Sequence, residues 1–211
     1  TKKPSKILKN KKMKTQKINS LTTALSISLI VLLFTSACAQ SGGSAKNDSN
    51  KSAQVKAVVD APEMDLQAAV MSGNVEVVKQ HIKAGTDIDK KDQMSGSTPL
   101  ISATTFGQKE IAKALIDAGA DLNIKNNDGA TPLHVAAFFC RVEIAQMLID
   151  ANADKTAKNN FGATPGESVS GPYADIKPIY EMLQQQLSPI GLQIDLNEIE
   201  KLRPVMAMML Q

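Results

Sequence analysis

Aromatic residues, histidine and cysteine are all scarce in this chain of 211 residues. It has no Trp, two Tyr, five Phe, two His and two Cys. Catalysis needs a nucleophile, a base or a metal set gathered in one place, and so few such residues argue against an enzyme. The shortage of aromatics argues against one globular core, whereas stacked helices rich in Ala, Leu and Ile pack without large rings. We expect no catalytic residues, no cofactor and no metal site.

Basic residues are unevenly distributed along the chain. The formal net charge is +3 at pH 7, but the first 37 positions contain eight Lys and no acid. Removing these eight from the 24 Lys and Arg leaves 16 against 21 Asp and Glu, a net charge of −5. An acidic folded portion offers no basic stripe for phosphates. Nucleic acid is therefore not an expected partner.

A short motif recurs at a fixed spacing. Gly129-Ala130-Thr131-Pro132-Leu133-His134 is preceded by Gly96-Ser97-Thr98-Pro99-Leu100, and Gly162-Ala163-Thr164-Pro165 follows it, each 33 residues away. Glycine allows a turn with positive φ. Threonine caps a helix N-terminus and proline fits the first helical turn. Each copy therefore predicts a turn followed by a short helix with an apolar face.

This Thr-Pro-Leu-x-x-Ala unit at a period of 33 resembles the ankyrin repeat. The resemblance covers about residues 63–185 and implies an all-α solenoid of three to four helix–turn–helix repeats. Degenerate first and last copies suit terminal repeats, which meet solvent on one side. The expected domains are repeats within 61–185 (about 63–92, 93–127, 128–160 and 161–185) and a C-terminal capping helix within 186–211.

Within the second repeat the pattern predicts helices over about 99–106 and 109–117, separated by a turn at Gly107. Gly119 is the expected left-handed helix stop. In the third repeat Asn152 stands at that stop, and asparagine is the next best residue for this conformation. Cys140 stands where the turn between the helices normally has glycine.

In the fourth repeat Gly166 and Ser168 disrupt the first helix, while apolar residues from Ile176 to Leu183 still predict a second one. Asp195 then begins a capping-box-like helix start. The amphipathic stretch that follows is expected to be interrupted at Pro204.

The first 37 residues read as a secretory signal. Residues 2–17 are rich in Lys, residues 21–34 are apolar, and Ser36-Ala37-Cys38 resembles the end of a bacterial lipoprotein box. Residues 1–12 would be an upstream artefact if translation starts at Met13. Cys38 is the expected lipidation site; cleavage before Gln40, giving a soluble periplasmic or secreted protein, and an uncleaved anchor remain alternatives.

Residues 38–60 are rich in Gly, Ser and Asn near their start and are expected to form a flexible tether. Lipidation would place the chain in the bacterial cell envelope, as a periplasmic lipoprotein held in a membrane by its lipid anchor. Ala39, in place of Asp, is compatible with the outer membrane.

The two histidines are expected to have structural roles, and the role of Cys140 stays open. The family uses the histidine at the position of His134 for hydrogen bonds that tie adjacent repeat loops together, and we expect that structural role here. His81 has no Cys or His partner at ligand spacing, so packing is expected. Cys140 would be the only free thiol if Cys38 is lipidated, and it leaves a redox function open.

The resemblance also predicts where a partner would bind. In ankyrin stacks the loop tips and the exposed positions of the first helices line a groove. Aromatics there would anchor a partner, although the same rings would be equally suited to packing between repeats. The residues so assigned are Ser102, Thr105, Phe106, Asn126, Asn127, Val135, Phe138 and Phe139.

The sequence thus predicts a protein-binding ankyrin-repeat module in the cell envelope, an adaptor or protective partner of another envelope protein. Two alternatives stay open: a peroxide-defence accessory that uses Cys140, and an immunity factor that neutralises a toxin.

Overall fold

The computed structural model describes residues 60–211, all within one compact unit. The predicted signal segment, the lipidation site Cys38 and nearly all of the predicted tether lie outside the described residues. The described part is helical and contains no strand. None of its helices is both long and apolar enough to cross a membrane, and it contains no cluster of His, Cys, Asp or Glu suited to a metal ion.

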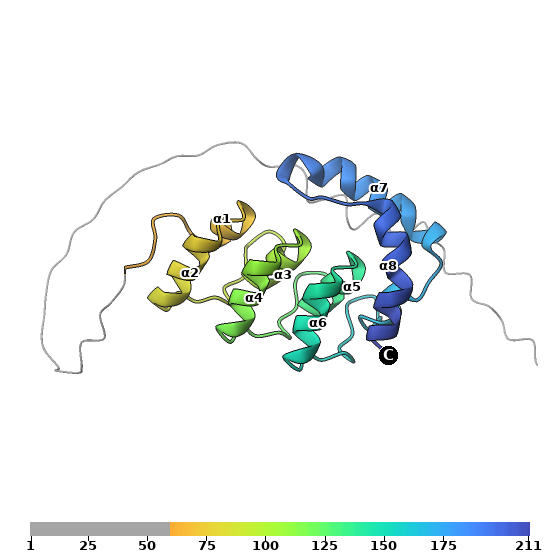
Figure 1. Ribbon diagram of the computed structural model, residues 1–211, viewed down its shortest axis with the longest axis horizontal. Helices are drawn as coiled ribbons and strands as arrows, with labels where there is room; N and C mark the ends of the chain where they lie inside the picture. Colours follow the sequence, from red (N-terminus) through yellow and green to blue (C-terminus); the bar gives the residue numbers. More distant parts are fainter. Residues whose placement is uncertain (1–59) are drawn as a thin grey trace, which may run out of the picture. The chain divides into compact units, whose positions relative to one another are not determined.

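Three helical hairpins follow one another and stack side by side (Figure 1). Each first helix packs against the next first helix, and each second helix against the next second helix. The elements are α1 (Leu66–Met71), α2 (Val75–Ala84), α3 (Pro99–Thr105), α4 (Lys109–Asp117), α5 (Pro132–Phe138), α6 (Val142–Asp150), the 3₁₀ helix η1 (Glu167–Val169), α7 (Tyr173–Leu187), the 3₁₀ helix η2 (Ser188–Ile190) and α8 (Leu196–Met209).

The repeated Thr-Pro pair starts the first helices as the sequence predicts. The Thr98 side chain accepts a hydrogen bond from the Ile101 backbone N–H, and the Thr131 side chain accepts one from His134. The following proline occupies the first turn, where its missing N–H costs no hydrogen bond. These short helices therefore begin at positions fixed by local chemistry.

The turns between helices and the helix ends also lie where the sequence predicts them. Gly107 and Cys140 both have positive φ, at 68° and 50°, in the turn between the two helices of their repeats. Gly119 and Asn152 have φ of 84° and 65° just after the second helices. The expected left-handed stop at Asn152 is confirmed.

The interior is a continuous row of small and aliphatic side chains shared by the three hairpins. Leu100 and Leu133, from equivalent positions of neighbouring repeats, are both fully buried in it. A repeat of this size buries too little apolar surface to fold alone, so it depends on its neighbours. The predicted all-α ankyrin-repeat architecture is confirmed.

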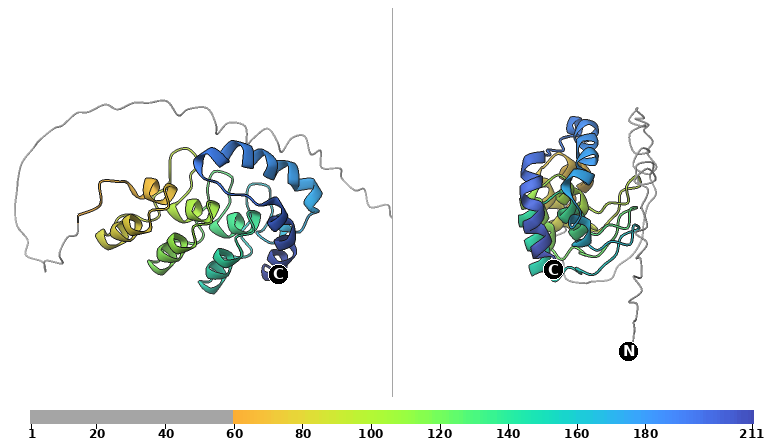
Figure 2. Two further views of the ribbon diagram at one scale, coloured as in Figure 1. Left: turned by 45° about the horizontal axis from the view of Figure 1, so that its top comes forward. Right: turned by 90° about the vertical axis from the view of Figure 1, so that its right-hand side faces the viewer.

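The fourth repeat departs from the pattern. Its first helix is reduced to η1, and α7 packs mainly against α8 and η2 instead of against α6. α8 packs against α5, α6 and η1, so α8 closes the end of the stack. Two views show α7 on the side of the first helices (Figure 2).

The expected interruption at Pro204 is wrong: α8 continues through it to Met209. A proline inside a helix removes one backbone hydrogen bond. The carbonyl that loses this hydrogen bond belongs to Glu200, four positions before Pro204. Both residues are exposed, so water can bind that carbonyl instead.

Candidate protein-binding site

The loops between hairpins are joined to one another at their tips. Asn127 donates from its side chain to the Met94 carbonyl and from its backbone to Ser95, at 2.9 Å each. One repeat later, Asn160 donates from its side chain to the Asn127 carbonyl at 2.9 Å. The same amide thus links each tip to the one before it. Asn126 supports its own tip, since its side chain accepts from two backbone N–H groups within the loop.

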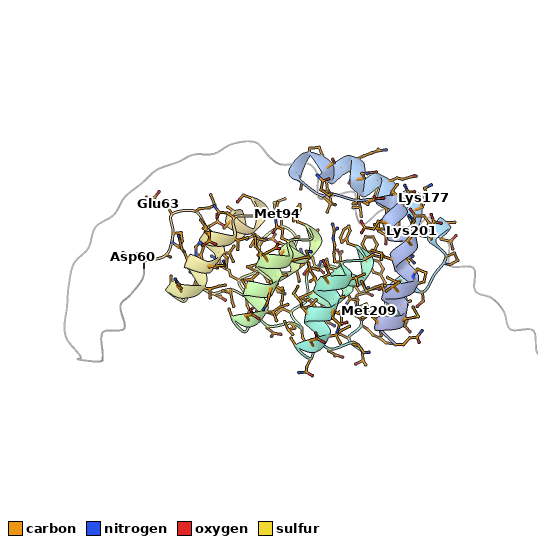
Figure 3. All side chains as sticks on the ribbon, viewed as in Figure 1. Asp60, Glu63, Met94, Lys177, Lys201 and Met209 are labelled. Atoms are coloured by element: carbon orange, nitrogen blue, oxygen red, sulfur yellow. The ribbon has the colours of Figure 1, made fainter. Side chains whose placement is uncertain are left out.

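Two large apolar side chains are exposed on these tips. Met94, labelled in Figure 3, is 55% exposed, and Phe161 is 60% exposed. Singly exposed apolar residues are common on protein surfaces. Here, however, they stand on backbone that the amide links hold in place, at opposite ends of the row of tips.

His134 connects the start of α5 to the last loop. Its Nδ1 accepts from the Thr131 N–H at 3.3 Å, and its Nε2 lies 3.0 Å from the Ala163 carbonyl. These partners require a neutral ring with its proton on Nε2. Burial lowers the pKa of His134, because a charged ring is poorly solvated there. The ring therefore serves as a fixed link between loops.

His81 is buried as well. Its ring nitrogens lie 2.7 Å from the Met64 carbonyl and 3.0 Å from the Thr86 hydroxyl. Both partners belong to the first repeat, so this histidine ties the start of the repeat to the end of α2.

The groove residues assigned from the sequence fall into two sets. Asn126 and Asn127 lie at the tips described above. Of those on the first helices and the turns after them, Ser102, Val135 and Phe139 are buried, whereas Thr105, Phe106 and Phe138 are half-buried.

The C-terminal segment accounts for part of this burial. The Phe138 ring lies 4.9 Å from the ring of Tyr180 on α7, and the Tyr180 hydroxyl donates to the Phe138 carbonyl. Arg203 of α8 in turn donates to the Tyr180 hydroxyl at 3.3 Å. The sequence allowed two roles for the aromatic rings, anchoring a partner or packing within the chain. The observed contacts of Phe138 are within the chain.

Residues 191–195, here called the strap, connect η2 to α8 and lie against the turn between α5 and α6. The guanidinium of Arg141 donates from Nη2 to the Gln193 carbonyl at 3.0 Å and to the Thr105 carbonyl at 3.3 Å. Gln184 of α7 donates to the Ile194 carbonyl at 2.9 Å. Leu192 and Ile194 are buried.

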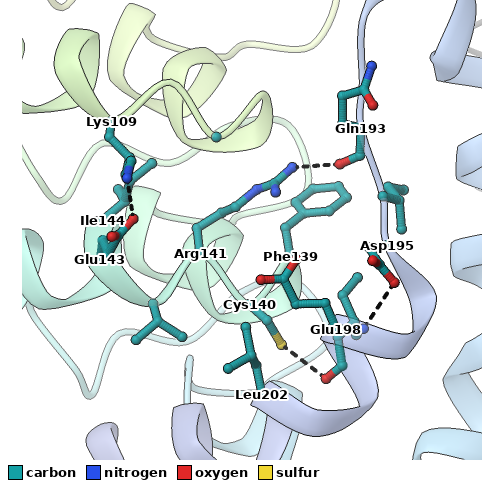
Figure 4. A pocket seen from close by; sticks show the side chains of 14 residues that line it. Lys109, Phe139, Cys140, Arg141, Glu143, Ile144, Gln193, Asp195, Glu198 and Leu202 are labelled. Carbon is teal, nitrogen blue, oxygen red and sulfur yellow. Dashed lines mark hydrogen bonds and ion pairs between the residues drawn. The ribbon is translucent and has the colours of Figure 1, made fainter.

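A cavity of about 330 Å³ lies beside the strap (Figure 4). It is lined by the turns of the second and third repeats, the strap and the start of α8. In Figure 4 the Arg141 side chain extends toward Gln193 and passes near Phe139. Sequence reasoning missed this site. The alternating apolar residues of the strap were its available signal, but nothing in the repeat pattern links them to Arg141.

Cys140 is buried at this turn, and its sulfur faces the Ile199 carbonyl at 3.9 Å. Burial raises its pKa to about 11, although Arg203 and Arg141 act in the opposite direction. Reactive cysteines have lowered pKa values and exposed sulfur. The geometry therefore gives the redox alternative no support.

Comparison with known proteins places this architecture in context. A family model described as ankyrin repeats in three copies matches residues 66–159. Protein phosphatase 1 regulatory subunit 27 of Homo sapiens is 47% identical over 64 residues, which cover 30% of this chain and 41% of that protein. An ankyrin repeat-containing protein of Schizosaccharomyces pombe is 39% identical over 61 residues, or 29% of each chain. These matches span less than half the length of either relative.

Among solved structures, the ankyrin repeat domain of Bcl-3 has 28% sequence identity and a TM-score of 0.48, covering 55% of this chain and 50% of that one. The family model and the stacked hairpins together identify residues 66–159 as ankyrin repeats.

Proposed function

We propose that this chain is a protein-binding module whose contact surface is the row of loop tips. One observation carries the proposal: Met94 and Phe161 are exposed on tips that the side chains of Asn127 and Asn160 hold together. A partner that covers them gains apolar burial without having to order the loops first, which lowers the cost of binding. Asn126 and Asn127, assigned to the site from the sequence, belong to this surface.

The comparisons support this class of function. One relative is named as a regulatory subunit of a protein phosphatase, which is a component that acts together with another protein. Within residues 60–211 no metal-binding cluster is found, and the one buried thiol has a raised pKa. These observations favour a role in holding a partner over a role in chemistry.

Cross-linking in cells tests the surface while the partner is still unidentified. A photoreactive residue at Phe161 or Met94 should capture the same protein, identified by mass spectrometry. Met208 on α8, which is 65% exposed, is the matched control and should not capture it. With the partner in hand, Phe161→Ser should weaken binding by about tenfold or more if the ring is an anchor. Equal capture from Met208, or an unchanged affinity, would rule out the tips.

We further propose that the module is a bacterial envelope lipoprotein anchored at Cys38, an adaptor or protective partner of another envelope protein. The support is the sequence order of lysine-rich leader, apolar run and Ser36-Ala37-Cys38. Mass spectrometry of the mature protein should find an acylated N-terminal Cys38, and Cys38→Ser should abolish the acylation. A free N-terminus at Gln40, or an intact leader, would contradict the anchor.

A further inference from the structure

We propose that the last loop tip, residues 158–162 and here called the open tip, binds an Asn-Xaa-Gly turn of a partner protein as the next member of the row. This assignment rests on the proposed function and names the partner element that the loop tips hold. The chain contains such a turn twice, as Asn127-Asp128-Gly129 and Asn160-Phe161-Gly162. The way each of them binds the tip before it is the template for the partner.

Two junctions between tips use the same pair of hydrogen bonds. Asn127 donates from its backbone N–H to the Ser95 carbonyl and from its side-chain amide to the Met94 carbonyl, at 2.9 Å each. Asn160 donates in the same way to the Asp128 and Asn127 carbonyls, at 3.0 and 2.9 Å. Each junction is therefore a two-point contact between one asparagine and two consecutive backbone acceptors.

The open tip offers the same two acceptors. Within residues 60–211, neither the Asn160 carbonyl nor the Phe161 carbonyl accepts a hydrogen bond. The tip also has the conformation of its neighbour, because the Asn159 side chain accepts from the Phe161 and Ala163 N–H groups. Asn126 makes the equivalent contacts in the tip before it. A partner turn therefore finds both acceptors already in place, which lowers the cost of binding.

The glycine of each tip shows which tips are covered. Gly96 and Gly129 are buried, whereas Gly162 is exposed. A Cβ added at Gly96 or Gly129 would meet the backbone nitrogen of the next tip's asparagine, at 3.2 and 2.7 Å respectively. A Cβ added at Gly162 would meet no atom of the described residues within 4 Å. The space that an asparagine fills at the two inner tips is therefore accessible at the open tip.

Lysines form a second row of links beside the tips. Lys91 donates from Nζ to the Lys125 carbonyl at 2.6 Å, and Lys125 donates from Nζ to the Lys158 carbonyl at 2.8 Å. Lys158 is exposed and forms no ion pair within residues 60–211. Glu167, the acid of the following turn, accepts from the Thr164 N–H at 2.8 Å instead. The open tip thus presents an ammonium donor for a backbone carbonyl of the partner turn, beside its two acceptors.

The other end of the row argues against a second copy of this chain as the occupant. Met94 stands where the later tips have asparagine, and its side chain has no N–H to donate. Its backbone N–H donates to the Asp92 side chain at 2.8 Å. The side-chain amides of Asn127 and Asn160 are already bonded within the row. A folded second copy therefore offers no free asparagine on these three tips, and the turn has to come from another protein.

Nuclear magnetic resonance of the isotope-labelled full chain tests the open tip. The probe is a cyclic synthetic peptide that holds Lys-Asn-Asn-Asp-Gly-Ala, the sequence of residues 125–130, in a turn. A few hydrogen bonds give a weak complex, so the titration extends to a few millimolar peptide. The amide signals of residues 160–163 should shift and saturate, while those of residues 93–96 should not. Absence of saturable shifts at residues 160–163 would overturn the proposal.

Two glycine variants form a matched pair. Gly162→Ala places a methyl group where the incoming asparagine belongs and should lower the affinity for the peptide at least tenfold. Gly85, at the end of α2, has φ of 73° against 78° at Gly162, and an added Cβ there also meets nothing within 4 Å. Gly85→Ala therefore has similar backbone strain and should bind as the unmodified chain does. Equal affinities of the two variants would refute the assigned position of the turn.

A change in the peptide tests the asparagine without altering the chain. The peptide that carries Asn127→Leu lacks the side-chain amide and should bind the unmodified chain several-fold more weakly. Equal affinity of the two peptides would refute the role of the amide. Lys158→Gln removes the ammonium and should also weaken binding of the first peptide; an unchanged affinity would refute the contact assigned to Lys158.

The remaining outcomes separate this proposal from the proposed function. If light scattering shows dimers of the unmodified chain that Gly162→Ala abolishes, a second copy occupies the open tip and the proposal is wrong. If the peptide fails to bind but Phe161 and Met94 still capture one protein, the proposed function stands and only the Asn-Xaa-Gly turn falls. Peptide binding without capture at either tip would instead count against the proposed function.

Discussion

Replacing His134 should test the link between α5 and the last loop. The His134→Ala change leaves the Thr131 N–H and the Ala163 carbonyl without their partners, and His134 is only 2% exposed. An unsatisfied buried donor or acceptor costs about 1–3 kcal/mol. With two such groups, the free energy of unfolding should fall by roughly 2–5 kcal/mol. Urea unfolding followed by circular dichroism measures this loss.

The same residue predicts a dependence on pH. Burial lowers the folded-state pKa of His134 below its ordinary value of 6.5, so the unfolded chain binds the proton more readily. The stability that depends on the neutral ring is therefore complete above about pH 6.5 and is lost as the pH falls below that value toward the folded-state pKa. Unfolding curves at pH 7.5 and 5.5 should show a smaller free energy at the lower pH.

His134→Gln is the control, because glutamine does not titrate and His81 is present in both proteins. The loss of stability between the two pH values should be smaller in His134→Gln than in the unmodified chain. An identical pH dependence in both proteins would refute the role assigned to the neutral ring.

Three other predictions follow from single contacts. Gly129→Ala should destabilise the stack by about 1–3 kcal/mol, since the added Cβ would meet the backbone nitrogen of Asn160 at 2.7 Å and φ is 72°; unchanged thermal unfolding would contradict this. Tyr180→Phe removes the hydroxyl bound to Phe138 and should cost about 1–3 kcal/mol, measured by urea unfolding, while faster amide exchange confined to α7 and α8 would locate the effect. In a Cys38→Ser chain, Cys140 should react with a thiol reagent at pH 8 far more slowly than it does after unfolding, because burial raises its pKa to about 11; rapid labelling of the folded chain would revive the redox alternative.

Much of the stack could be predicted from the sequence because the deciding interactions are local. Each signal acts within a few positions of the chain. A threonine side chain caps the backbone N–H three residues later, a proline occupies the first helical turn, and a left-handed residue ends the helix. The stop at Asn152 is predictable for this reason. The path of α8 through Pro204 is not, because it depends on solvent exposure of the surrounding backbone, which a sequence does not reveal.

The candidate site was less predictable. The repeat pattern places Asn127 at a loop tip, but its bond to the Met94 carbonyl joins residues 33 positions apart and appears only when the repeats stack. The sequence allows Phe138 equally as an anchor or as packing, and its contact with Tyr180, 42 residues away, depends on the path of α7. The 33-residue repeat pattern does not continue into α7.

The sequence by itself therefore determined that residues 66–150 would form successive helical hairpins, since each turn, cap and apolar face is encoded within one repeat. Only the tertiary structure decided which surfaces stay open. After the regular repeats end, α7, the strap and α8 are positioned by contacts with residues such as Phe138 and Arg141. Such contacts between distant residues leave no regular pattern in the chain, and they cover the turn of the third repeat while the loop tips remain exposed.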